Sequence, residues 1–141
     1  MKYLHIDNQL FIKNRNLFFN KLNANYMAVL NSNDIMPTNA DGTMPFRQNN
    51  DLFWLSGVDQ EESVLIIYPD NSNEQEKEIL FLKETSELIA IWEGAKLSKS
   101  KAFATSGIKS VYWLNEFDNK LNELTQKCDG TVSYTHLTLP T

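Results

Sequence analysis

The chain lacks several features that would place it in a specialised class. Its 141 residues include one cysteine, Cys128, which excludes an internal disulfide and fits a reducing compartment. No segment approaches the roughly 20 apolar residues of a membrane-spanning helix, and residues 1–13 lack the apolar run of a signal peptide. We therefore expect a cytoplasmic protein with no membrane partner.

Clustered positive charge is also missing. The chain has 13 Lys and Arg residues against 18 Asp and Glu residues, and its formal net charge is -5. Proteins that bind nucleic acids neutralise phosphates with clustered Lys and Arg, so we expect no nucleic-acid partner. Hydrophobic residues make up 42% of the chain, which is enough apolar material for the core of one globular domain.

Motifs of conventional catalysis are scarce. The two histidines, His5 and His136, lie far apart in the sequence, and there is no zinc-protease motif, paired-cysteine spacing, phosphate loop or nucleophile elbow. A dinuclear metal site needs several convergent Asp, Glu and His ligands, and no such set can be assembled from this chain. We therefore expect no catalytic residue and no metal ligand here, and no activity from the chain alone.

The chain does contain an alternation of helix and strand patterns. Asp7 or Asn8 is predicted to cap a first helix with these apolar positions: Leu10, Phe11, Phe18 and Leu22. Short apolar runs predict strands at residues 27–30, 63–68, 78–83 and 111–114. A second helix is predicted at 97–105, with Ser98 as its N-terminal cap and Gly107 as its stop. A third helix is predicted at 116–127. This alternation indicates an α/β domain with helices on the faces of its sheet.

The end of the chain departs from this alternation. Residues 131–141 are neutral and rich in Thr, and their β-branched and aromatic residues can form one strand. Residues 133–141, however, resemble a translated sequencing-adapter read-through. We therefore predict a native domain at 1–130, incomplete at its C-terminal end, and a non-native tail at 131–141. An unpaired sheet edge would make such a chain marginally stable or prone to associate.

The most informative segment is residues 39–57, which combines acids, amides, an Arg and aromatic residues. We interpret it as a turn-rich loop that either braces itself or presents a binding surface. Gln48 is predicted to satisfy backbone groups of its own loop, and Phe53 and Trp54 are predicted to be core residues. Gly57 is predicted to need a positive φ.

Within this segment, residues 45–57 read Pro-Phe-Arg-Gln-Asn-Asn-Asp-Leu-Phe-Trp-Leu-Ser-Gly. They resemble the Pro-(Phe/Tyr)-Arg-Gln-x-x-Asp-Phe-x-Tyr-Leu-(Ser/Thr)-Gly signature of the N-terminal domain of Xaa-Pro aminopeptidases, members of the creatinase or pita-bread superfamily. Leu52 and Trp54 depart from the signature but stay apolar. The order of the flanking elements also agrees, so the resemblance covers about residues 8–128.

The resemblance implies a non-catalytic α/β domain with a mixed β-sheet flanked by helices. In such enzymes a following domain holds two Mn²⁺ ions with two Asp, one His and two Glu, and a bridging water attacks the peptide bond before proline. The implied substrate is a peptide with proline in second position, and the implied assembly is a homo-oligomer. The N-terminal domain shapes substrate access and supplies part of the oligomer interface.

Three residues match family positions near the substrate entrance or a neighbouring subunit: Asp41, Arg47 and Trp92. Each has an alternative structural interpretation. Asp41 precedes a glycine and is typical of a turn, Arg47 can pair with Asp51, and Trp92 can pack in the core.

An alternative function remains open. Related domains occur in inactive pita-bread proteins, including histone-chaperone subunits, where they act as protein-interaction modules. Intact metal ligands downstream of this domain would indicate an enzyme, and their loss would indicate an interaction module.

Overall fold

The structure, a computed structural model, describes residues 6–32, 48, 50–85 and 97–134. Its longer elements follow in the order α1 (Asn8–Phe19), β1 (Tyr26–Asn31), α2 (Asn50–Ser56), β2 (Val64–Ile67), β3 (Glu78–Leu82), α4 (Lys99–Ser106), β4 (Ser110–Trp113), α5 (Phe117–Thr125) and β5 (Gly130–Tyr134). Short 3-10 turns precede β3 and α5, at Glu74–Glu76 and Leu114–Glu116.

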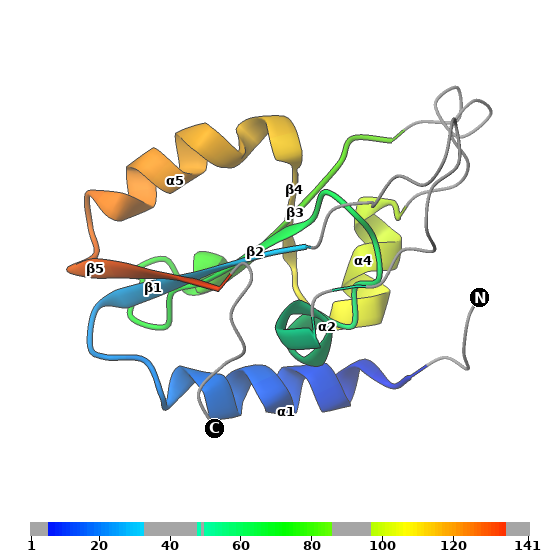
Figure 1. Ribbon diagram of the computed structural model, residues 1–141, viewed down its shortest axis with the longest axis horizontal. Coiled ribbons are helices and arrows are strands. Elements are labelled where there is room, and N and C mark those ends of the chain that lie inside the picture. Colours follow the sequence, from blue (N-terminus) through cyan, green and yellow to red (C-terminus); the bar gives the residue numbers. More distant parts are fainter. Residues whose placement is uncertain (1–5, 33–47, 49, 86–96, 135–141) are drawn as a thin grey trace, which may run out of the picture.

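The strands form one mixed sheet between two helical layers. The strand order is β4-β3-β2-β1-β5. β2 is antiparallel to both neighbours, whereas β3 pairs with β4 and β1 with β5 in parallel. Helices α1, α2 and α4 cover one face and α5 covers the other (Figure 1). The predicted mixed sheet flanked by helices is confirmed.

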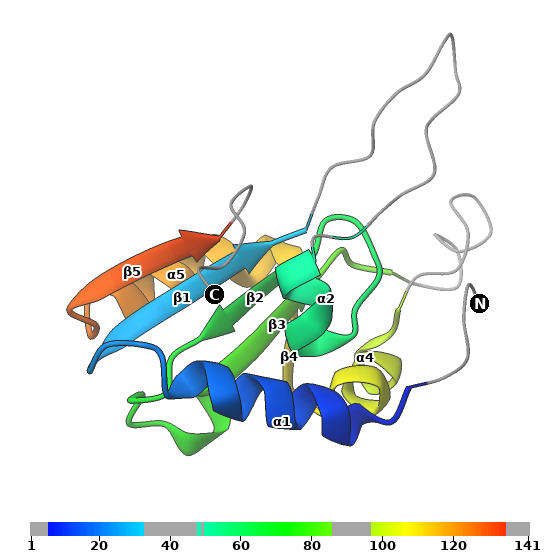
Figure 2. The same cartoon turned by 60° about the horizontal axis from the view of Figure 1, so that its bottom comes forward.

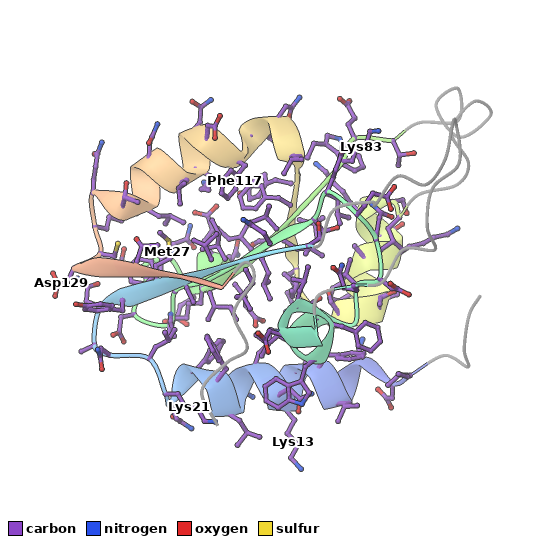
Figure 3. All side chains as sticks on the ribbon, in the orientation of Figure 1. Lys13, Lys21, Met27, Lys83, Phe117 and Asp129 are labelled. Atoms are coloured by element: carbon purple, nitrogen blue, oxygen red, sulfur yellow. The ribbon has the colours of Figure 1, made fainter. Side chains whose placement is uncertain are left out.

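Each face of the sheet has its own hydrophobic cluster, because successive strand residues point to opposite faces. On β1, Ala28 and Leu30 join the cluster under α1, α2 and α4, while Met27 and Val29 join the cluster under α5. Figure 3 shows Met27 and Phe117 between the sheet and α5. Burial on both faces explains why the strands read as continuous apolar runs.

Helix α1 begins as predicted, and it buries some but not all of its predicted apolar positions. The Asp7 carboxylate accepts a hydrogen bond from the backbone N–H of Gln9 at 3.0 Å and caps the helix. Phe11 and Phe18 are buried, whereas Leu10 remains 49% exposed. The prediction for Leu10 was therefore wrong, because a helix turns by about 100° per residue and Leu10 faces solvent when Phe11 faces the sheet.

Helices α2 and α4 end with the same local structure. Ser56 and Ser106 each accept a backbone hydrogen bond from the residue two positions later, both at 3.1 Å. The intervening glycines, Gly57 and Gly107, have φ angles of +72° and +78°. The predicted positive φ at Gly57 and helix stop at Gly107 are confirmed, because glycine adopts the left-handed conformation without a steric penalty.

The prediction of a loop throughout 39–57 was wrong, because residues Asn50–Ser56 form α2. Leu52 and Leu55 are fully buried and lie three positions apart, so they share the face toward the core. Trp54 is 42% exposed, which corrects its prediction as a core residue. Phe53 is partly buried and contacts Phe11 edge-on, with ring centroids 6.0 Å apart.

Strand β5 lies at an edge of the sheet, beside β1 (Figure 2). Its register runs from Tyr26 opposite Gly130 to Leu30 opposite Tyr134. The turn before β5 is fastened to Asn25, whose carbonyl accepts the N–H of Asp129 at 2.8 Å. Residues 131–134 thus continue the fold as a strand, and whether residues 131–141 are native stays a prediction.

Candidate functional site

The three site residues inferred from the family resemblance lie outside the described part of the chain. Asp41 and Arg47 belong to residues 33–47, which follow β1, and Trp92 belongs to residues 86–96, which follow β3. Strands β1 and β3 are each antiparallel to β2. They therefore run in the same direction, and their C-terminal ends lie at the same end of the sheet. The described residues that directly follow β1 and β3, Ser32 and Lys83, therefore lie at that end of the sheet.

Gln60 contacts two residues at the borders of these two segments, Gln48 and Leu97, and we call the three residues Gln48, Gln60 and Leu97 the glutamine junction. The side-chain amide of Gln48 donates to the carbonyls of Val58 at 3.0 Å and Gln60 at 2.9 Å. The backbone N–H of Leu97 donates to Oε1 of Gln60 at 2.9 Å. The prediction that Gln48 satisfies backbone groups of its own segment is confirmed.

Gln60 is the buried centre of the glutamine junction, with 6% of its surface exposed. The N–H of Leu97 fixes the side-chain orientation, because only the oxygen of an amide accepts a hydrogen bond. The Nε2 group of Gln60 is also buried, and among the described residues it has no hydrogen-bond partner. A buried donor without a partner typically costs about 1–3 kcal/mol, so this orientation depends on the surrounding contacts.

Two serines brace the glutamine junction against the sheet. Ser63 is fully buried and directly precedes β2. Ser63 exchanges hydrogen bonds with Ser32, which directly follows β1. The N–H of Ser32 donates to the Ser63 carbonyl at 2.8 Å, and the N–H of Ser63 donates to Oγ of Ser32 at 3.0 Å. The Ser63 hydroxyl donates to the Gln60 carbonyl at 2.9 Å. Gln60 is therefore anchored to the ends of two central strands.

A second polar cluster lies on the α5 side and consists of Glu76, Tyr112 and Lys120. One carboxylate oxygen of Glu76 accepts hydrogen bonds from the Tyr112 hydroxyl at 2.6 Å and from the Lys120 ammonium at 2.9 Å. Burial alone would raise the pKa of Glu76, but these hydrogen bonds and the charge of Lys120 lower it below its ordinary value. This charge-assisted network joins the β2–β3 connection to β4 and α5.

Gln60 and Arg15 are among the buried polar residues that were not identified from the sequence. Gln60 stands in an Asp-Gln-Glu-Glu run that is typical of a solvated surface, so no local signal marked it. Arg15 is fully buried on the same stripe of α1 as Phe11 and Phe18. Its position at i+4 from Phe11 and i−3 from Phe18 is a signal that could have found it.

The described residues contain no group of three or more His, Cys, Asp or Glu side chains that could hold a metal ion. Within the same residues, no helix is long and apolar enough to cross a membrane. The chemistry available at the glutamine junction is hydrogen bonding by neutral amides and hydroxyls. Such groups position neighbouring chain segments and do not activate a nucleophile.

Solved structures of aminopeptidases share this fold. The Pseudomonas aeruginosa aminopeptidase PepP superimposes with a TM-score of 0.84 at 20% identity, covering 98% of this chain and 30% of that protein. A variant of Escherichia coli aminopeptidase P superimposes with a TM-score of 0.79 at 22% identity, covering 91% of this chain and 29% of that protein. The fold is thus that of one part of aminopeptidase P.

The sequence comparisons agree with the fold. The family model described as Aminopeptidase P, N-terminal domain, matches residues 11–133. The chain therefore belongs to this family, as its resemblance predicted. The Xaa-Pro aminopeptidase of Haemophilus influenzae is 26% identical over 114 residues, 81% of this chain and 26% of that protein. The Escherichia coli Xaa-Pro aminopeptidase is 23% identical over 88% of this chain and 28% of its own length. The chain spans about a quarter of these relatives.

Proposed function

We propose that this chain is the N-terminal domain of an Xaa-Pro aminopeptidase, a hydrolase that removes the first residue from peptides with proline in second position. The family match over residues 11–133 is the observation that carries the proposal. The names of the relatives support the substrate class, because the Haemophilus influenzae, Escherichia coli and human matches are all Xaa-Pro aminopeptidases.

In this proposal the domain shapes access to an active site that it does not itself contain. Asp41, Arg47 and Trp92 are the proposed access residues, near the substrate entrance or a neighbouring subunit. The described residues do not fit a Mn²⁺ site, because no suitable group of ligands is present among them. The two proposed Mn²⁺ ions would belong to a following domain, with two Asp, one His and two Glu as ligands.

The proposal also includes a cytoplasmic homo-oligomer. Four large hydrophobic side chains are between 42% and 49% exposed, on α1, α2 and α4: Leu10, Leu17, Trp54 and Phe103. Such residues are compatible with contacts to another subunit. Sedimentation of the longer protein at several concentrations tests this part, and a concentration-independent monomer would contradict it.

The decisive experiment is to sequence the source gene from codon 120 onward and to express the full reading frame. The expected product has five metal ligands downstream and cleaves a Xaa-Pro peptide in Mn²⁺-containing buffer but not the matched Xaa-Ala peptide. An uninterrupted frame without those ligands would contradict the enzyme proposal. Binding of protein partners by such a product would then favour the interaction-module alternative.

A further inference from the structure

We propose that the outer side of α1 binds the α1 of a second copy of this chain, with the two helices antiparallel. This inference rests on the homo-oligomer of the proposed function, and it names the face and the orientation of one contact. The surface, called the α1 stripe, has three exposed apolar side chains between two exposed ends of opposite charge. Its members are Asp7, Leu10, Leu17 and Lys21 on α1 or at its ends, and Trp54 on α2.

Sequence spacing places four members of the α1 stripe on one side of the helix. Leu10 comes three positions after Asp7 and seven before Leu17. Lys21 comes four positions after Leu17. Residues three, four or seven positions apart share one side of an α-helix. Lys21 lies beyond the last helical residue, but its N–H donates to the Phe18 carbonyl at 2.9 Å, so the chain keeps its helical course there.

Trp54 extends the apolar part of the α1 stripe onto α2. Asn14 stands between the two leucines on the same side of α1, and its side-chain amide donates to the Trp54 carbonyl at 2.8 Å. This hydrogen bond holds Trp54 beside the middle of the stripe. The side chains of Leu10, Leu17 and Trp54 are half-exposed. Apolar side chains that gather on a surface typically mark an interaction site, and tryptophan is enriched near the centre of such sites.

The ends of the α1 stripe carry opposite charges, which favours a second copy over other partners. Within the part of the chain that the structure describes, Asp7 and Lys21 take part in no ion pair. An antiparallel second copy places its Lys21 next to Asp7 and its Leu17 next to Leu10. A parallel copy would bring like charges together, and a partner of one charge sign, such as an anionic membrane, would be repelled by one end.

The α1 contact is small compared with a standard protein interface. The 12 residues of α1 span about 18 Å, whereas a stable interface buries roughly 800 Å² per partner. We therefore expect this contact to be weak by itself and to add to other contacts in the longer protein. Lys13 points away from the sheet beside the stripe (Figure 3), where its ammonium reaches solvent at the rim of the contact.

The first test removes the apolar part of the α1 stripe. Sedimentation equilibrium of the protein expressed from the full reading frame measures the association constant. We expect Leu17→Lys and Trp54→Ala each to lower this constant about tenfold or more, because a few buried anchors carry most of the binding energy of an interface. Leu10→Lys provides a second route to the same patch if Leu17→Lys fails to fold.

Phe103→Lys is the matched control, with an expected change of less than about twofold in the association constant. Phe103 is about as exposed as Leu17, but it lies on α4. The end of α4 packs on Ile12, because a Cβ atom at Gly107 would lie 2.7 Å from the Ile12 side chain. Ile12 is two positions from Leu10 and therefore lies on the other side of α1.

The second test exchanges the charges at the two ends. Asp7→Lys and Lys21→Glu should each weaken association about fivefold, because each variant carries one charge sign at both ends. An equimolar mixture of these two variants should associate within about twofold of the wild type, since every end of one variant then meets an opposite charge on the other. Asp7→Asn keeps a side-chain cap on α1 and separates the loss of charge from the loss of the cap.

Several outcomes would overturn the second-copy contact. An oligomer whose association constant is unchanged in Leu17→Lys and Trp54→Ala would keep the proposed homo-oligomer and remove α1 from its interface. A mixture of the charge variants that associates no better than either variant alone would overturn the antiparallel orientation. Lower stability of Leu17→Lys in urea with unchanged association would assign the stripe to a following domain of the same chain. A wild type that stays monomeric would overturn the homo-oligomer as well, whereas peptide cleavage tests the enzyme proposal separately.

Discussion

Two carboxylates near the start of β3 show how the same ion-pair chemistry serves the two faces of the sheet. Glu76 and Glu78 are two positions apart, and their side chains reach opposite helical layers. Glu78 pairs with Arg15 of α1, and Glu76 pairs with Lys120 of α5. Each helical layer is therefore tied to the chain near the start of β3 by one acid and one base.

The two pairs differ in how much water reaches the cation. The Arg15 side chain is fully buried, and it also donates to the Leu55 carbonyl at 2.9 Å. Lys120 retains 17% exposure and has a second carboxylate, Glu123, at 3.2 Å. A buried cation that loses its partner is costly, whereas a partly solvated one is compensated by water. We therefore expect the α1 side to be the more sensitive face.

The largest expected effect comes from breaking the buried pair. Arg15→Met should lower the free energy of unfolding by about 3 kcal/mol, because it leaves Glu78 and the Leu55 carbonyl without their buried partner. Urea denaturation monitored by circular dichroism measures this change. Lys77→Ala is the control, because Lys77 pairs only with the exposed Glu74 among the ion pairs described. Equal losses in both variants would contradict the expectation.

A double substitution sharpens this result. Arg15→Met combined with Glu78→Leu should be more stable than Arg15→Met alone, because no unpaired carboxylate remains and apolar replacements of an ion pair can be nearly neutral. The buried Nη2 of Arg15 has no hydrogen-bond partner among the described residues, and the substitution also removes this group. The same urea titration measures the coupling, and strictly additive losses would contradict it.

On the other face, Glu76→Gln should lower the free energy of unfolding by about 2 kcal/mol, because hydrogen bonds to a charged group contribute roughly 1.5–3 kcal/mol to stability. The substitution replaces the charged acceptor shared by Tyr112 and Lys120 with a neutral amide. Glu74→Gln is the matched control, since the Glu74 side chain is 81% exposed. A loss that exceeds that of Arg15→Met would reverse the proposed order of the two faces.

The Glu76 contribution should also depend on pH. Because the folded pKa of Glu76 lies below its ordinary value of 4.5, its stabilisation is complete above pH 4.5 and is lost as the pH falls through the folded pKa. The difference in unfolding free energy between the wild type and Glu76→Gln should therefore be constant from about pH 6 to 8. It should shrink below pH 4.5, and a difference that grows there would have the wrong sign.

The smallest expected effect is that of Tyr112→Phe, at about 1 kcal/mol. It removes one hydrogen bond to Glu76 but keeps the aromatic ring that stacks on Phe81 at 5.9 Å between centroids. Thermal unfolding measures the change, with Tyr26→Phe as a control at a partly buried tyrosine at the start of β1. If Tyr112→Phe lowered the free energy of unfolding as much as Glu76→Gln, Tyr112 rather than Lys120 would contribute most of the stability of this cluster.

Helix α2 shows where local sequence reasoning reached its limit. The positive φ predicted for Gly57 is confirmed, yet the residues before it were interpreted as a loop. The polar run before Leu52 is typical of turns, and the helix has only 7 residues, too few for a clear period. Its formation depends on Leu52 and Leu55 packing in the core, which is a tertiary effect.

In the candidate site, too, a contact within one segment was predicted and a tertiary contact was missed. Gln48 was predicted to serve its own segment and does so, because Val58 and Gln60 are close along the chain. Gln60 was missed, since nothing local distinguishes it from the acids around it and its burial requires β1, β2 and Leu97 to meet. The access residues Asp41, Arg47 and Trp92 stay predictions.

The sequence by itself determined the class of fold, the strands as apolar runs, and the helix ends at Asp7, Ser98 and Gly107. These features depend on hydrogen bonds and φ angles within a few residues. Tertiary structure alone decided the strand order, the burial of Arg15 and Gln60, and the exposure of Trp54. Those outcomes depend on contacts between residues far apart in the chain, whose energies no local pattern contains.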